Sequence, residues 1–240
     1  IPGTGVTCKC IVPYCKVRGD LNGDGVLIAM LGPPCKTDGV PEKSIILKHT
    51  VPTTVEEDAC ESILLQAAHE RAPGAKYCLL QTTSDKSSVL VNPGITARAI
   101  RFLIKNWPHW KTCYNLHTLI VTIPYGGKYK ADEEIAVNEA SAHGIIIVAA
   151  GGWGRMGVAF PAKLGAVISV AAMTGCSGTL APFFPVSREL DCVGLGFMKI
   201  GSDFMIGAGI STIMVATDLA LLFQHFSCTN NALIRNMCIN

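Results

Sequence analysis

The segment most informative about the architecture is Ala142-His-Gly-Ile-Ile-Ile-Val-Ala-Ala-Gly-Gly152. Within it, Gly144 closes an amphipathic helical pattern over Ala131–His143, and the continuous apolar run Ile145–Ala150 follows at once. A second apolar run covers Gly165–Met173. Continuous apolar runs bounded by Gly or Pro are typical of strands that are buried on both faces of a parallel sheet. This part of the chain therefore predicts a helix and two buried strands.

The same alternation extends in both directions along the chain. We expect further strands at Val26–Leu31, Lys76–Gln81 and Leu119–Ile123, and further helices at Thr54–Arg71, Thr96–Asn106, Gly207–Phe226 and Ala232–Cys238. The helix over Thr96–Asn106 is expected to end before Pro108, because proline breaks helices. Alternating strands and helices predict an α/β fold with a doubly wound, mostly parallel sheet. We expect one domain over residues 1–240, with an irregular Cys-rich segment at about 1–24.

Composition narrows the classes of partner. Of the 240 residues, 49 % are hydrophobic and 16 % are charged, which excludes a disordered chain. The net charge of +2 gives no reason to expect nucleic acid or an anionic membrane as a partner. The best candidate for a membrane span is Met205–Phe223, but it carries Asp218, so we expect a buried helix of an α/β domain instead.

The eleven cysteines cannot all pair within one chain, because their number is odd. Cys8, Cys10 and Cys15 are close enough to form a clip, yet no C-x-x-C pair occurs and we expect no metal site there. The odd count, the lack of an N-x-S/T sequon and the lack of a visible signal peptide favour an intracellular location, with an extracellular one left open.

Several motifs match only in part. Residues Asp20–Gly25 fit the first half of a calcium loop, but its twelfth position is Leu31, so a turn is expected and a partial calcium site is the alternative. His109, Cys113 and His117 recur every four residues and would share one face of a helix, although we expect an unrelated loop there. No phosphate-binding loop or dinucleotide fingerprint occurs, and we expect no cofactor.

Four segments, in order, resemble the subtilisin-like serine protease family. They are Gly25–Pro34, then Glu56–Leu64 with Ala72–Tyr77, then Ala142–Gly152 with Phe160–Ala172, and last Gly207–Leu222. The third segment is close to the family's G-I-x-V-V-A-A-A-G-N, and its continuation to Y-P-A-x-x-x-x-V-I-x-V-G-A. Together they cover roughly residues 24–226. The resemblance implies a three-layer α/β/α sandwich.

The family's chemistry needs an Asp, a His and a Ser from three elements, and an Asn amide for the oxyanion. Carried over by the resemblance, these positions hold Gly32, Glu56, Gly209 and Gly152. Ser211, two residues beyond the nucleophile position, points towards the opposite face of a helix. We therefore predict a catalytically degenerate member of the family, a pseudoprotease, and not an enzyme.

The family pairs an extended substrate with two edge segments, which the resemblance places at Ile123–Gly127 and Ala149–Trp153. Their carbonyls and most of their amides are expected to be available, so a protein or peptide segment is the expected partner of this vestigial cleft. The candidate groove residues are Pro124, Tyr125, Gly126, Gly151 and Trp153. The two aromatic residues either flank the groove or pack in the core.

Two alternatives stay open. The first is a hydrolase with relocated chemistry, using Ser211, an acid among Glu56, Glu57 and Asp58, or a cysteine near a histidine. The cysteine candidates are Cys113, near His109 and His117, and Cys228, near His225. The second is a structural module that self-associates or belongs to a larger multidomain protein.

Overall fold

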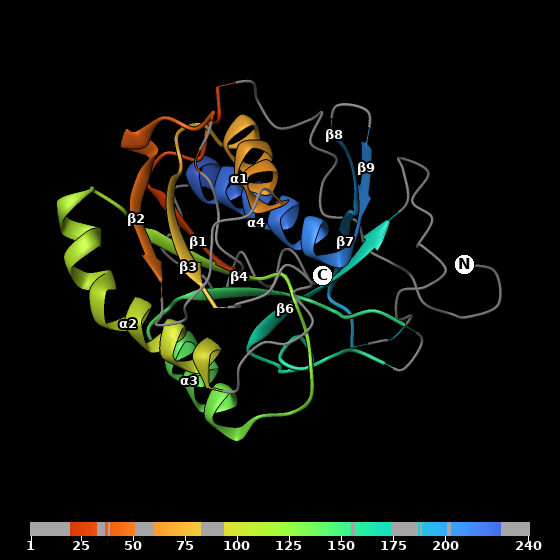
Figure 1. Ribbon diagram of the computed structural model, residues 1–240. Helices are drawn as coiled ribbons and strands as arrows, with labels where there is room; N and C mark the ends of the chain where they lie inside the picture. Colours follow the sequence, from red (N-terminus) through yellow and green to blue (C-terminus); the bar gives the residue numbers. More distant parts are fainter. Residues whose placement is uncertain are drawn as a thin grey trace.

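The computed structural model describes residues 20–32, 37, 39–50, 60–82, 94–154, 157–173, 187, 189–200 and 203–226. Seven parallel strands form one sheet in the order β2-β3-β1-β4-β5-β6-β7 (Figure 1). They are β1 Val26–Gly32, β2 Ile45–Thr50, β3 Lys76–Gln81, β4 Thr118–Ile123, β5 Ile146–Ala150, β6 Val167–Met173 and β7 Cys192–Leu195. The strand order reverses next to β1, which makes the sheet doubly wound.

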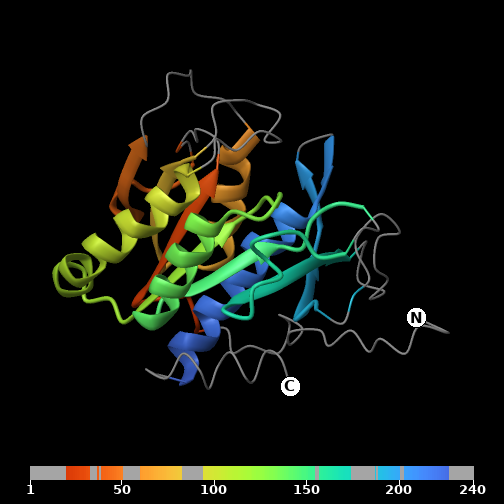
Figure 2. The ribbon, with the colours of Figure 1, turned by 90° about the horizontal axis from the view of Figure 1, so that it is seen from below.

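Four α-helices cover the two faces of this sheet (Figures 1 and 2). They are α1 Cys60–Arg71, α2 Ile95–Cys113, α3 Ala131–Ala142 and α4 Ala208–Phe226. One apolar core joins α1 and α4 to one face, and a second core joins α2 and α3 to the other. A 3-10 turn, η2 Glu42–Ser44, and an antiparallel hairpin, β8 Phe197–Ile200 with β9 Asp203–Ile206, complete the described elements. The fold is a three-layer α/β/α sandwich, as predicted.

Strand β1 shows why an apolar run becomes a central strand. Every one of its residues is buried. Successive side chains point to opposite faces, so Ile28 and Met30 enter the core beneath α4, while Ala29 and Leu31 enter the core beneath α2. A strand with both faces covered needs a continuous apolar sequence rather than an alternating one.

The expectation that a helix ends before Pro108 is wrong. Helix α2 runs through Pro108 to Cys113. Trp107 and Trp110 lie in its last two turns and are buried, and Trp110 meets Phe102 edge to face with ring centroids 6.0 Å apart. Burial of these two rings outweighs the hydrogen bond that Pro108 cannot donate.

The structure also contains three strand features that the sequence did not predict. Edge strand β2, terminal strand β7 and the β8–β9 hairpin were not predicted. The predicted strands and helices that the structure describes are all present. Apart from the end of α2, their described ends lie within two residues of the predicted ends. The start of the helix predicted at Thr54, the helix predicted at Ala232–Cys238 and most of the segment 1–24 lie outside the described residues.

Helix α4 is the one described helix that is long and apolar enough to cross a membrane, with 72 % of the window Ala208–His225 buried inside the molecule. It packs against the sheet and against α1. Its charge, Asp218, pairs with Arg71 of α1, with 2.7 Å between Oδ1 and Nε. The partner explains how a carboxylate is accommodated in this apolar helix.

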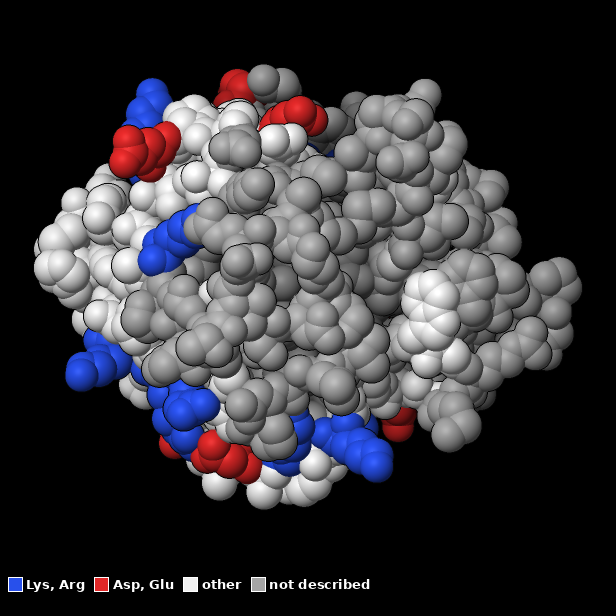
Figure 3. Space-filling view, viewed as in Figure 1, with Lys and Arg blue, Asp and Glu red and all other residues white. Residues whose placement is uncertain are grey.

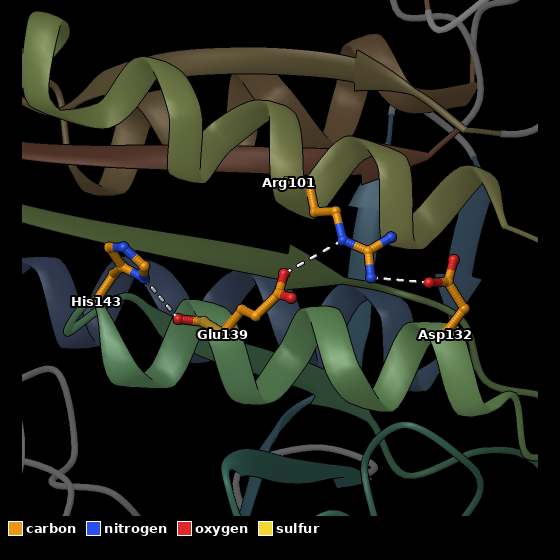
Figure 4. Close-up of polar contacts among 4 residues, drawn as sticks. All are labelled: Arg101, Asp132, Glu139 and His143. Atoms are coloured by element: carbon orange, nitrogen blue, oxygen red, sulfur yellow. Dashed lines mark hydrogen bonds and ion pairs between the residues drawn. The ribbon is translucent and has the colours of Figure 1, made fainter.

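Charged side chains of both signs are mixed on the described surface. Figure 3 shows Lys and Arg near Asp and Glu along the upper, left and lower margins of one face. Figure 4 shows one such group, in which Arg101 of α2 bridges Asp132 and Glu139 of α3 at 2.8 and 3.2 Å. Because Arg101 is 39 % exposed and Asp132 is exposed as well, water screens these contacts and they contribute little to stability.

Candidate cleft at the carboxyl edge of the sheet

Three of the four family positions lie at the carboxyl edge of the sheet. Gly32 is the last residue of β1, and its carbonyl accepts a hydrogen bond from the Thr82 amide at 2.7 Å. The pairing of β1 with β4 ends at Met30 and Thr122, two residues before Gly32 and Pro124. Gly152 follows β5, and Gly209 opens α4. The fourth position, Glu56, lies outside the described residues.

Gly209 lies directly against the backbone of Pro124. A β-carbon at position 209 would stand 2.9 Å from the Pro124 carbonyl oxygen and 3.2 Å from the Pro124 β-carbon. Real β-carbons essentially never approach a backbone oxygen this closely. A side chain at the position that bears the nucleophile in the family therefore requires a shift of the start of α4 or of the Pro124 segment.

Gly152 is restricted in two ways. Its φ is +99°, a left-handed conformation that side-chain-bearing residues rarely adopt. A β-carbon here would also stand 2.7 Å from the β-carbon of Ala159. An asparagine at this position would be both strained and overpacked.

The backbone of the two groove edges is partly occupied within the chain. Gly127 and Phe160 exchange both of their backbone hydrogen bonds, at 2.7 and 3.2 Å. The Gly151 amide donates to the Val170 carbonyl at 2.7 Å, and the Gly151 carbonyl accepts from the Ala159 amide at 2.9 Å. The expectation that most of these groups are available does not hold at Gly127 and Gly151.

The two groove aromatics have different surroundings. The hydroxyl of Tyr125 lies 2.8 Å from Oγ1 of Thr82 and 3.2 Å from Oγ1 of Thr96, and its ring packs against the core beneath α2. Trp153, in contrast, is 67 % exposed. Tyr125 therefore fixes the position of one groove edge, while Trp153 presents an apolar ring to solvent at the other.

Ser211 is fully buried and lies away from the groove. Its hydroxyl donates to the Gly194 carbonyl at 3.2 Å, and its side chain packs against Gly194 and Gly196. A nucleophile has to reach a substrate carbonyl, and a serine in this environment does not. The described geometry gives no support to Ser211 as a relocated nucleophile.

The expectation of a loop over His109, Cys113 and His117 is wrong for the first two residues, because α2 continues to Cys113, and His117 lies beyond the helix. His109 and Cys113 lie on the last turns of α2, and the Cys113 sulfur is 3.6 Å from Nε2 of His109. His117 follows the helix, with its ring against Gly25, and burial lowers its pKa. Within the part of the chain that the structure describes, no three metal-ligating side chains come together. His225 is exposed, whereas Cys228, Glu57 and Asp58 lie outside the described residues.

The calcium-like segment forms a turn that is fastened to α4. Asn22 Oδ1 accepts hydrogen bonds from the Asp24 amide and from Nε2 of Gln224, both at 3.0 Å. Gln224 Oε1 accepts from the Asn22 and Gly23 amides at 2.7 Å. Asn22 is thus engaged by the chain itself, which supports the interpretation of this segment as a turn.

No protein-family model and no curated protein sequence matches the chain, but solved structures do. A cold-adapted subtilisin-like serine proteinase superposes with a TM-score of 0.74 at 14 % identity, over 91 % of this chain and 82 % of that one. The prenylagaramide maturation protease PagA gives 0.71 at 17 % identity, over 90 % and 83 %. A mutant of the protease domain of PatA gives 0.69 at 20 % identity, over 91 % and 88 %. The chain has the subtilisin-like fold, which confirms the resemblance at the level of architecture.

Proposed function

We propose that this chain is a non-catalytic, subtilisin-like domain that binds an extended protein or peptide segment in its cleft. The similar solved structures are named as proteases, so the proposal rests on how this chain departs from the family pattern. Gly32, Gly152 and Gly209 stand where the family has its aspartate, its oxyanion asparagine and its nucleophile. Glycine supplies neither a nucleophile nor a proton acceptor nor a side-chain amide.

The observation that carries the proposal is the contact between Gly209 and Pro124. A β-carbon at position 209 would stand only 2.9 Å from the Pro124 carbonyl oxygen. The site therefore differs from the family pattern in its backbone spacing as well as in the missing serine side chain. The start of α4 lies closer to the end of β4 than a serine would permit. This close packing supports the proposal that the site works without a nucleophile at position 209.

Binding has a physical basis in the same region. The two groove edges, residues 123–127 and 149–153, continue two neighbouring strands of the sheet, and we expect a segment laid between them to gain backbone hydrogen bonds as an added strand does. The exposed ring of Trp153 supplies apolar area at one edge. The polar partner groups are backbone amides and carbonyls, which favours a peptide over a charged small molecule.

The test uses two tryptophan substitutions at glycines with open space. A β-carbon at Gly127 or at Gly165 meets no described atom within 4 Å, so both variants are expected to fold. Gly127 belongs to the groove edge, whereas Gly165 precedes β6 at the opposite edge of the sheet. A random 12-residue peptide library is selected on the wild-type chain, and binding of the selected peptides is measured for all three proteins.

We expect the selected peptides to bind the wild type and the Gly165→Trp variant equally. Binding to Gly127→Trp is expected to weaken by about tenfold or more, because the indole would occupy the groove. Equal binding to all three proteins would move the binding site away from the cleft. Failure to select any peptide, or cleavage of the selected peptides, would contradict the proposal.

A further inference from the structure

We propose that Asn22 is a site of intramolecular deamidation, and that the side chain of Gln224 protects it in the folded chain. Asn22 and Gly23 form the only Asn-Gly dipeptide in the sequence. An asparagine before glycine is prone to this reaction, because glycine has no side chain to hinder the approach of its backbone nitrogen and its backbone moves freely. The dipeptide lies in the calcium-like turn before β1, at the edge of the sheet opposite the cleft.

The reaction needs only hydroxide and water. Hydroxide removes the proton from the Gly23 amide, and the nitrogen attacks Cγ of Asn22 to form a cyclic succinimide. The bond between Cγ and Nδ2 breaks, and the side-chain nitrogen takes up a proton and leaves as ammonia. Water then opens the ring at either carbonyl carbon, which leaves an aspartate or an isoaspartate residue at position 22. No group is oxidised or reduced in these steps.

In the folded chain the attacking nitrogen is closed off. Gly23 is buried, and its amide donates to Oε1 of Gln224 at 2.7 Å. The same oxygen accepts from the Asn22 amide, also at 2.7 Å. Hydroxide reaches an amide proton that is bonded inside a protein only when the structure around it opens. The first step of the reaction therefore requires the contacts of Gln224 to break.

The side chain under attack is also held in place. Oδ1 of Asn22 accepts from the Asp24 amide and from Nε2 of Gln224, both at 3.0 Å. The Asn22 carbonyl accepts from the Gly74 amide at 2.7 Å, and a β-carbon at Gly74 would stand 2.5 Å from Oδ1 of Asn22. Ring closure brings Cγ onto the Gly23 nitrogen, and this rotation would break the bonds to Oδ1.

Gln224 is the one described side chain that bonds to both reacting groups, through its oxygen to the Gly23 amide and through its nitrogen to Oδ1 of Asn22. Asp24 and Gly74 contribute backbone amides, which a substitution does not remove. Because Gln224 lies near the end of α4, the docking of this helix controls the reactivity of the turn. An isoaspartate would lengthen the backbone of the turn by one carbon and weaken the same contact.

The experiment incubates the folded full chain at mildly alkaline pH and follows deamidation of Asn22 by peptide mapping in a mass spectrometer. Wild type is compared with Gln224→Ala and with Gln224→Glu, which keeps the acceptor and loses the donor. Asp191→Ala is the matched control, because Oδ2 of Asp191 likewise accepts from two groups, the Ser169 amide at 2.8 Å and hydroxyl at 3.0 Å, between β6 and β7. All four proteins are also incubated unfolded in urea.

We expect Asn22 in the folded wild type to react at least about tenfold more slowly than in urea, where all four proteins should react equally. Gln224→Ala should raise the folded rate by about tenfold or more, and Gln224→Glu by about two- to tenfold, because fewer bonds oppose opening of the turn. Asp191→Ala should change it by less than about twofold.

Three results would overturn the proposal. The first is a folded wild type that reacts as fast as the chain in urea. The second is a folded rate that rises in neither Gln224 variant, and Gln224→Glu alone decides this point if Gln224→Ala does not fold. The third is an equal rise in Asp191→Ala, which would mean that Asn22 reacts through general unfolding and that Gln224 gives no local protection.

Discussion

Gly209 is the residue on which the account of the cleft depends. Its neighbour is a backbone carbonyl of the loop after β4, which cannot rotate away as the end of a flexible side chain can. Overpacking of this kind forces the backbone to shift, and it commonly costs about 1–3 kcal/mol. Restoring a serine would therefore require movement of α4 or of the Pro124 segment.

We predict that Gly209→Ser lowers the free energy of unfolding by about 1–3 kcal/mol and produces no peptide hydrolysis. The matched control is Gly207→Ala, where the nearest described atom to an added β-carbon is 3.9 Å away, so stability should change by less than about 0.5 kcal/mol. Urea denaturation measures both. A Gly209→Ser protein as stable as the wild type would show that the 209 position is more open than the structure indicates.

The resemblance assigns residues to the family positions, but the sequence does not say what surrounds those residues. Gly209 and Pro124 are 85 positions apart in the chain, and their contact depends on how α4 docks on the sheet. Likewise, the bonding of Gly127 to Phe160 follows from the path of a loop and has no local signature. The buried state of Ser211 could be anticipated from its offset of two residues along the helix.

Among the elements, α2 shows where local rules give way to packing. The rule that a proline ends a helix failed at Pro108 because Trp107 and Trp110 bury large rings on the same side of α2. Central strands such as β1, β4 and β5 were predictable because both of their faces are covered. Strand β2 was missed because it lies at the sheet edge, and its sequence IILKHT lacks a clear pattern.

The pairing of α4 with α1 has a pH dependence that can be measured. Burial raises the pKa of Asp218 from 3.8 to about 6, although the Arg71 guanidinium opposes the shift. The folded chain therefore binds more protons than the unfolded chain between these two values. The contribution of Asp218 to stability is fully present below pH 3.8 and is lost as the pH rises to about 6.

We predict that Asp218→Asn removes this part of the pH dependence, which corresponds to about 3 kcal/mol for a shift of about two pKa units. In urea titrations, the unfolding free energy of the wild type should fall relative to that of Asp218→Asn as the pH rises from 4 to 7. Asp132→Asn is the control, because the Arg101 hydrogen bond lowers the pKa of Asp132 and its effect has the opposite sign. A wild type and an Asp218→Asn variant with parallel pH profiles would contradict the prediction.

In the whole molecule, one contact joins two distant parts of the chain. Gln224, near the end of α4, holds the turn before β1 through three hydrogen bonds with Asn22 and Gly23, across 202 residues of sequence. This contact fixes the far end of α4 relative to the central strand. The opposite end of the same helix carries Gly209, so the contact also helps to set the geometry of the cleft.

We predict that Gln224→Ala lowers the free energy of unfolding by about 2–4 kcal/mol, because it leaves two part-buried amides without their acceptor and removes one of the two hydrogen bonds to Asn22 Oδ1. Gln224→Glu keeps the acceptor and loses only the donor, so it should cost less. The midpoint of urea denaturation measures the two variants. Equal losses in both would mean that the amide donor, rather than the acceptor, maintains the contact.

The measurement that bears most directly on the central proposal is labelling with a fluorophosphonate serine-hydrolase probe, read by intact-mass spectrometry. Wild type and Ser211→Ala are treated side by side, with an active subtilisin-like protease as the positive control. The proposal of a non-catalytic cleft predicts no adduct on either form of this chain. A stoichiometric adduct on the wild type, above all one lost in Ser211→Ala, would contradict it and would make the chain a hydrolase with a rearranged site.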